Sequence, residues 1–194
     1  MPSTPDTLIT LLDQQAASSA GKYHFLKDGQ DVADTADYAT LRKHAFAVAN
    51  QLRERAPEGA RALLLYPPGL DVLPAFFGCL NAGIVAVPVP PPDGVRLKHS
   101  LPRLQGIVAD AEAKVILTTA GLRQDLEARL SEALPDVHWI ATDTLTPAEE
   151  ASFKLPDITA GSLAYLQYTS GSTTSPRGVM LSHGNVLANL TYLQ

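Results

Sequence analysis

Ten residues late in the chain, TSGSTTSPRG at positions 169–178, combine the side chains of this sequence that are best suited to binding an anion. Six of them are Ser or Thr, whose hydroxyls donate hydrogen bonds, and the two glycines leave backbone N–H groups open to a ligand. Arg177 adds a permanent cation with a planar fork that pairs with phosphate oxygens. The pattern predicts a phosphate site formed by Thr169, Ser170, Gly171, Ser172, Thr173, Thr174, Arg177 and Gly178.

Two other interpretations of this segment compete with a phosphate site on the residues alone. A Walker A loop has four residues between its glycines and then a Lys-Ser/Thr pair. Here six residues stand between Gly171 and Gly178 and no such pair follows, so a kinase-like loop is disfavoured. An exposed hairpin turn explains the composition as well as a phosphate site does, because Ser, Thr, Gly and Pro are also common turn residues.

The elements that must position this loop follow from hydropathy patterning. The loop stands between two apolar segments of strand length, LAYLQY at 163–168 and GVMLS at 178–182, and before them apolar runs alternate with segments of helical periodicity. That alternation predicts an α/β fold with a mainly parallel sheet and helices on both faces. The predicted strands cover 61–66, 84–89, 115–118 and 137–141, and the predicted helices between them cover 70–81, 101–111 and 122–134.

The rest of the chain adds two N-terminal helices, a linker and a final helix. Thr4 is the predicted cap of a first helix that ends before Gly21, a short strand follows at 23–29, and Asp37 is the predicted cap of a second helix. A last helix opens at Ser182 or Asn185. The predicted organisation is an α/β subdomain at 1–141, a polar connector at 142–161, and the phosphate-loop hairpin with the start of the next helix at 162–194.

Composition excludes several function classes. The 194 residues carry 15 Lys and Arg against 20 Asp and Glu, a net charge of −5, and contain no basic run, which argues against binding nucleic acid or an anionic membrane surface. From Val72 to Pro92 no residue is charged, but prolines and glycines divide this stretch, so we expect a buried helix and strand rather than a membrane span. The N-terminus lacks the features of a secretory signal, and a cytoplasmic location is expected.

Other reactive side chains receive structural interpretations. Cys79 lies on an apolar helix and is expected to be core packing, and the five histidines lack the paired spacing of a zinc site, so no metal ligand and no catalytic residue is assigned. His183 is expected to make a structural hydrogen bond at a helix entry rather than to meet a nucleotide. Glu149 and Glu150 are expected to form a solvated acidic turn, and the Pro90–Pro92 run to stiffen the exit from a strand.

The loop and its flanks closely resemble the adenylate-forming superfamily of acyl-CoA synthetases, fatty acyl-AMP ligases and peptide-synthetase adenylation domains. The shared motif is Thr-Ser-Gly-Ser/Thr-Thr-Gly-x-Pro-Lys-Gly, and this chain has TSGSTTSPRG followed by VMLSHGN. Thr174 stands where Gly is commonest and Arg177 where Lys is commonest. The segments LLLYPPGLDVLPAFFGCLNAGIVAVPVPPP and LPRLQGIVADAEAKVILTT are similar to the fatty acyl-AMP ligase branch in particular.

This resemblance implies a reaction. The loop would hold the β- and γ-phosphates of ATP with Mg²⁺ while a fatty-acid carboxylate attacks the α-phosphate, giving acyl-AMP and pyrophosphate. The acyl group would then pass to the phosphopantetheine arm of an acyl carrier protein, or to a downstream polyketide or peptide synthase.

The family's Tyr-Gly-x-Thr-Glu segment, its ribose-binding Asp and its late catalytic Lys are not found in these residues. We therefore expect an N-terminal fragment, inactive alone, of a truncated adenylate-forming fold, with an acyl-CoA synthetase fragment and a non-catalytic nucleotide-binding remnant as alternatives.

Overall fold

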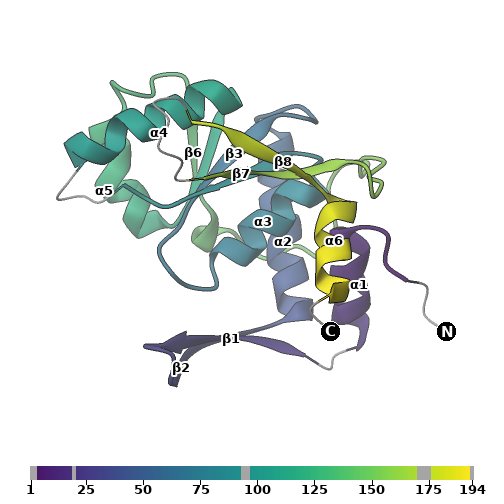
Figure 1. Ribbon diagram of the computed structural model, residues 1–194. Helices are drawn as coiled ribbons and strands as arrows, with labels where there is room; N and C mark the ends of the chain where they lie inside the picture. The colour runs from purple at the N-terminus through teal and green to yellow at the C-terminus, as the bar shows by residue number, and fades with distance from the viewer. Residues whose placement is uncertain (1–3, 19–20, 93–96, 170–175, 193–194) are drawn as a thin grey trace.

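The computed structural model describes residues 4–18, 21–92, 97–169 and 176–192, which form two sheets surrounded by helices (Figure 1). A two-stranded antiparallel hairpin joins β1 (Lys22–Lys27) to β2 (Asp31–Asp37) and projects away from the main body. The large sheet has the order β6-β5-β3-β4-β7-β8. Its strands are β3 (Arg61–Leu65), β4 (Val85–Val89), β5 (Val115–Thr118), β6 (His138–Ala141), β7 (Leu163–Tyr168) and β8 (Gly178–Ser182).

The large sheet is parallel except at one edge. The pairs β3–β4, β3–β5, β5–β6 and β4–β7 are parallel, and β8 alone among the described strands of this sheet runs antiparallel to its neighbour, β7. The central strand β3 is almost wholly buried because both of its faces are covered, which is why its sequence is a continuous apolar run. The predicted α/β fold with a mainly parallel sheet is confirmed.

The direction of the chain across the sheet decides which helix covers which face. From β3 the chain steps to β4 on one side, then returns past β3 to β5 and on to β6. Because parallel crossovers are right-handed, a reversal of direction moves the connecting helix to the opposite face. Accordingly α3 (Val72–Asn81) packs beside α2 (Tyr38–Arg53) on one face, while α4 (Leu97–Ala111) and α5 (Ala120–Leu130) cover the other.

Successive residues of β3 point to opposite faces of the sheet and so enter the two hydrophobic cores, one on each face. Leu64 packs with Val48 and Leu52 of α2 and with Cys79 of α3, whereas Leu63 contributes to the core under α4 and α5. Cys79 has no exposed surface, and its burial raises the pKa of its thiol well above the ordinary value. A buried, protonated thiol is unreactive, so the structural interpretation of Cys79 holds.

The connector at 142–161 must carry the chain from β6 at one end of the sheet to β7 beyond β4. It begins with a 3₁₀ turn at Thr142–Thr144 and then runs along α2, as right-handedness requires. Ala148 donates its N–H to the Lys43 carbonyl at 3.1 Å, and the Lys43 ammonium lies 2.7 Å from the largely exposed carboxylate of Glu149. Ser152 donates its N–H to Asn50 Oδ1 at 2.7 Å. These contacts hold a polar segment without a core of its own.

Several local predictions differ from the structure, and helix α4 begins at Leu97 rather than at the predicted Leu101. The first helix, α1 (Leu8–Ser18), is capped by Thr7 rather than Thr4: Thr10 N–H donates to Thr7 Oγ1 at 3.0 Å, and Thr7 N–H donates to Thr10 Oγ1 at 3.1 Å. Strand β2 was not predicted, because DVADTAD is exposed along most of its length and shows no apolar alternation. Helix α5 begins and ends earlier than predicted, since Thr119 caps it by accepting from Leu122 N–H at 3.3 Å.

The uncharged stretch from Val72 to Pro92 forms helix α3 and strand β4, as predicted. Within the described ranges, no helix is both long enough and apolar enough to cross a membrane.

His183 joins the two ends of the described chain. It is the first residue of α6 (His183–Tyr192), which lies beside α1, and it is only 1% exposed. Its Nδ1 accepts the Leu8 N–H at 3.1 Å, so the ring proton resides on Nε2. Burial lowers the pKa of His183 below its ordinary 6.5. The predicted structural hydrogen bond is confirmed, and protonation would place a second donor against the Leu8 N–H.

We expect the stability of the chain to fall below pH 6.5 in a way that depends on His183. The unfolded state takes up a proton that the folded state excludes, so stability is full above the unfolded pKa and is lost toward the lower folded pKa, by up to about 1.4 kcal/mol per pH unit. His183→Asn keeps an acceptor without a titrating ring and should lose less free energy of urea unfolding between pH 7.5 and 5.5. His138→Asn, at an exposed position, should retain the wild-type loss; equal pH dependence in all three proteins would contradict the assignment.

Candidate functional site

The carboxyl ends of the parallel strands define the edge where a ligand is expected. In open α/β sheets, ligands bind outside these ends, at a point where neighbouring strands send their connections to opposite faces. Strands β3 and β4 meet this condition, because α3 and α4 follow them on opposite faces. The predicted phosphate loop starts at the carboxyl end of β7, the parallel neighbour of β4. The topology therefore brings the loop next to the switch point.

The structure describes both ends of the phosphate loop, which we define as residues 169–178. Thr169 and Arg177 are exposed, and Tyr168 pairs with Gly178 across the β7–β8 hairpin, as the flanking strands predicted. A Cβ atom on Gly178 would lie 3.0 Å from the Tyr168 ring, so a larger residue there would require the ring to shift by a few tenths of an ångström. Five of the predicted site residues lie outside the described residues: Ser170, Gly171, Ser172, Thr173 and Thr174.

Helix α4 contacts both ends of this loop through residues that sequence reasoning missed. Arg103 Nη2 donates to the Thr169 carbonyl at 3.4 Å, and the Tyr168 hydroxyl donates to Asp110 Oδ2 at 2.6 Å. The pyrrolidine of Pro176 packs on Gly106, where a Cβ atom would lie 2.9 Å from Pro176 Cγ. These residues stand about sixty positions before the loop, so no local pattern joins them to it.

Charge at the loop base is partly compensated. The guanidinium groups of Arg103 and Arg177 stand at its two ends, and Asp110 is held by the Tyr168 hydroxyl. Burial raises the pKa of Tyr168, and the hydrogen bond to Asp110 and the negative charge of Asp110 raise it further. Tyr168 therefore stays a neutral donor to Asp110 at physiological pH.

Hydrogen bonds between hydroxyl groups and backbone carbonyls link the carboxyl ends of β3, β5 and β6. Thr118 Oγ1 donates to the Leu65 carbonyl at 2.7 Å, and Thr142 Oγ1 donates to the Thr118 carbonyl at 3.3 Å. Tyr66 Oη lies 2.6 Å from Thr142 Oγ1 and, since that hydroxyl proton is already used, Tyr66 is the donor. These bonds join the ends of β3, β5 and β6 and leave their hydroxyls committed to the fold.

The edge stays open beside β4. A cavity of about 190 Å³ lies after the end of this strand, between the Pro90–Pro92 run and the first half of α4, and Arg103 is part of its wall. Arg103 therefore belongs both to this cavity and to the base of the phosphate loop.

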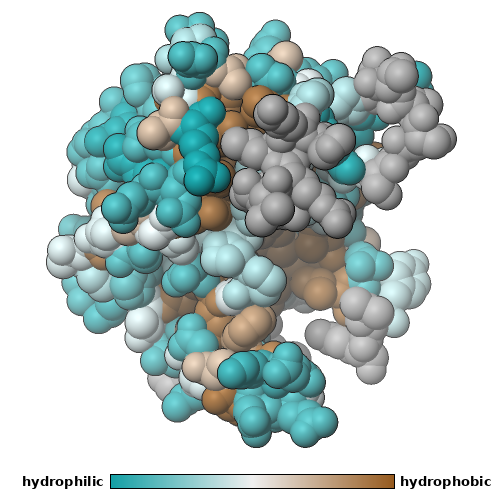
Figure 2. All heavy atoms as spheres, turned by 90° about the vertical axis from the view of Figure 1, so that its left-hand side faces the viewer, coloured by the Kyte–Doolittle hydropathy of each residue, from teal (hydrophilic) through white to brown (hydrophobic). Residues whose placement is uncertain are grey.

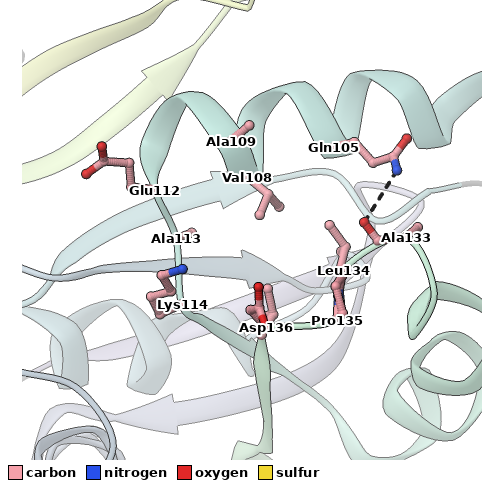
Figure 3. Close-up of a pocket in the computed structure, with 11 residues that line it drawn as sticks. Gln105, Val108, Ala109, Glu112, Ala113, Lys114, Ala133, Leu134, Pro135 and Asp136 are labelled. Carbon is pink, nitrogen blue, oxygen red and sulfur yellow. Dashed lines mark hydrogen bonds between the residues drawn. The ribbon is translucent and has the colours of Figure 1, made fainter.

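A larger cavity, of about 410 Å³, lies at the opposite edge of the sheet (Figure 3). Its wall includes Val108, Lys114 and Val137, which lie in the second half of α4 and just before β5 and β6, and Gln105 spans its rim by donating to the Ala133 carbonyl at 3.4 Å. Figure 2 shows the other side of the molecule, toward the carboxyl ends of the strands, where the surface is mostly hydrophilic and apolar side chains are visible in the hollows. Because it lies at the amino ends of the strands, this cavity is not the phosphate site.

Comparisons with known proteins agree with this geometry. The family described as AMP-binding enzyme matches residues 12–194. Among curated relatives, the medium-chain-fatty-acid–[acyl-carrier-protein] ligase JamA of Moorena producens is 43% identical over 193 residues, covering 97% of this chain and 33% of the relative. The long-chain-fatty-acid–AMP ligase FadD23 of Mycobacterium tuberculosis is 34% identical over 165 residues, covering 84% of this chain and 28% of the relative.

Solved structures show the same fold. A fatty acyl-adenylate ligase from L. pneumophila, crystallised with acyl adenylate and pyrophosphate, superposes with a TM-score of 0.82 at 35% identity, over 95% of this chain and 32% of that protein. The chain thus spans about a third of the length of its relatives. With a family match over residues 12–194, nearly the whole chain, the chain belongs to the AMP-binding enzyme family.

Proposed function

We propose that this chain is the N-terminal part of an ATP-dependent fatty acyl-AMP ligase and contributes the part of its site that holds the ATP phosphates. The observation that carries the proposal is the position of the hydroxyl- and glycine-rich loop at the carboxyl end of β7, beside the switch point of a sheet shared with fatty acyl-adenylate ligases. We also propose the division into a subdomain at 1–141, a connector at 142–161 and the loop hairpin at 162–194.

In this function the loop binds the β- and γ-phosphates of MgATP, with Mg²⁺ entering as part of the substrate. The hydroxyls of the loop and the Arg177 fork donate hydrogen bonds, with Thr169, Ser170, Gly171, Ser172, Thr173, Thr174, Arg177 and Gly178 as the binding residues. A fatty-acid carboxylate oxygen attacks the α-phosphorus, the bond from that phosphorus to the β-phosphate oxygen breaks, and pyrophosphate leaves. Donors at the loop stabilise the charge that moves onto the leaving pyrophosphate.

The acyl acceptor is proposed to be the phosphopantetheine thiol of an acyl carrier protein, alone or within a polyketide or peptide synthase. Its sulfur attacks the acyl carbonyl and AMP leaves. JamA, at 43% identity, is named as a ligase that uses an acyl carrier protein. Transfer to CoA is the second candidate. It is favoured by FadD21 of Mycobacterium tuberculosis, which is 34% identical to this chain and is named as a putative fatty-acid–CoA ligase. We place the reaction in the cytoplasm.

The test of the reaction uses the full polypeptide that the gene encodes. With MgATP and a fatty acid, we expect exchange of labelled pyrophosphate into ATP that depends on the fatty acid, and acyl transfer to a phosphopantetheinylated carrier protein rather than to CoA, both followed by mass spectrometry. Acyl-CoA as the dominant product would favour the second candidate. MgATP binding without any exchange would reduce the function to nucleotide binding.

Removing the charge of Arg177 should weaken nucleotide binding. A charge-assisted hydrogen bond is worth about 1.5–3 kcal/mol, so Arg177→Ala should raise the Kd for MgATP in the full polypeptide by about tenfold or more. Arg177→Lys keeps the charge but not the planar fork, so its Kd should lie between those of the wild type and Arg177→Ala. Arg129→Ala removes an exposed arginine on α5 and serves as the matched control. An unchanged Kd for Arg177→Ala, measured by calorimetry, would remove Arg177 from the site.

A further inference from the structure

We propose that helix α4 holds the two described ends of the phosphate loop in place through positioning residues. We call Arg103, Gly106 and Asp110 the α4 anchor. They stand at spacings of three and four residues, so their side chains fall on one face of the helix. This inference rests on the proposed function for its consequence in ATP binding, but the anchor itself is a set of contacts that can be tested without a nucleotide.

The anchor reaches both ends of the loop. On the side of β7, Arg103 binds the Thr169 carbonyl at 3.4 Å and Asp110 accepts from the Tyr168 hydroxyl at 2.6 Å. On the side of β8, Pro176 rests on Gly106, with no room for even a Cβ atom between them. A loop attached by its two strands alone would be free to tilt about the end of the hairpin, whereas contacts at both ends fix that tilt.

The anchor face has a rigid support. Leu104, Ile107 and Ala111 of the same helix are buried in the core that also contains β3 and β4. Since buried side chains are close-packed, α4 cannot move relative to the sheet without disturbing this core. Because α4 is fixed on the sheet, its contacts with the loop ends also fix those ends relative to the strand ends beside which ATP would lie. A displacement of the loop by about 1 Å can lower the catalytic rate about a hundredfold, so a fixed position of the loop matters for the reaction.

Gly106→Ala separates anchoring from stability. Alanine is the better helix former, so the substitution favours α4 while its Cβ atom displaces Pro176. Gly121 lies in α5, where an added Cβ atom would meet open space, and Gly121→Ala is therefore a matched control for the helix effect. A protein weakened at the loop but unchanged or raised in thermal stability would show an effect of position alone.

The first readout is local and needs no nucleotide. Trypsin can cleave after Arg177 only when the start of β8 separates from β7, so the cleavage rate at this bond, followed by mass spectrometry in the full polypeptide, reports how firmly the loop base is held. We expect about a tenfold faster cleavage in Gly106→Ala, corresponding to about 1.4 kcal/mol, and no change in Gly121→Ala. Equal rates in wild type and Gly106→Ala would overturn the proposal.

The hydrogen bond between Tyr168 and Asp110 gives an independent arm. Tyr168→Phe and Asp110→Ala should each accelerate cleavage at Arg177, and Asp110→Asn, which keeps an acceptor oxygen, should restore the wild-type rate. Tyr165→Phe, the same substitution on the same strand, is the control. Failure of Asp110→Asn to restore the rate, with Asp110→Ala accelerated, would show that charge rather than this bond matters and would overturn this part of the anchor.

The second readout links the anchor to ATP. In Gly106→Ala the Kd for MgATP should rise in proportion to the loss of anchoring, while the control Gly121→Ala binds as the wild type does. Faster cleavage with an unchanged Kd would show that the anchor does not position the phosphate site. If the wild-type polypeptide itself binds no MgATP, the proposed function fails, and the cleavage rates still decide whether the anchor exists.

Discussion

The parallel pairing of β7 with β4 is the contact on which the candidate site depends. It places Tyr165 beside Ala86, although 78 residues separate them in the sequence, and it carries the loop after β7 to the same edge as the ends of β3 and β4. Forming it requires the connector to cross the whole sheet, which is why that segment is tied to α2 by Lys43 and Asn50. Without this pairing the ends of the loop would not lie at that edge.

Helix α4 serves the fold and the site with two different faces. Leu104, Ile107 and Ala111 fill the core, while Gly106 and Asp110 meet the loop base. The same crossover that takes the chain from β4 back to β5 brings this helix across the carboxyl edge beside β7. The position of α4 in both the fold and the candidate site therefore follows from the change of direction at β4. A substitution that moved α4 would disturb both the core and the contacts with the loop ends.

The central strands of the large sheet were predictable because they are buried on both faces, so that RALLL of β3 and VILT of β5 are nearly continuous apolar runs. Strand β2 was not, since an exposed hairpin arm needs no apolar alternation to form backbone hydrogen bonds. The phosphate-binding residues of the loop stay a prediction from their types and order. The partners of the loop on α4 were not, because an arginine, a glycine and an aspartate on a helix have many roles, and only the tertiary fold brings these three to Thr169, Pro176 and Tyr168.

With a net charge of −5, the proposed binding of a polyphosphate requires local rather than global positive charge. At physiological ionic strength the Debye length is about 8 Å, so acidic side chains elsewhere on the surface are largely screened from the loop. At the loop base, Arg103 and Arg177 supply two positive charges and Asp110 one negative charge, a local sum of +1 over these three residues. The Tyr168 hydroxyl binds the carboxylate of Asp110 and so holds that negative charge on α4, while Arg103 and Arg177 supply the positive charge that the proposed phosphate binding requires.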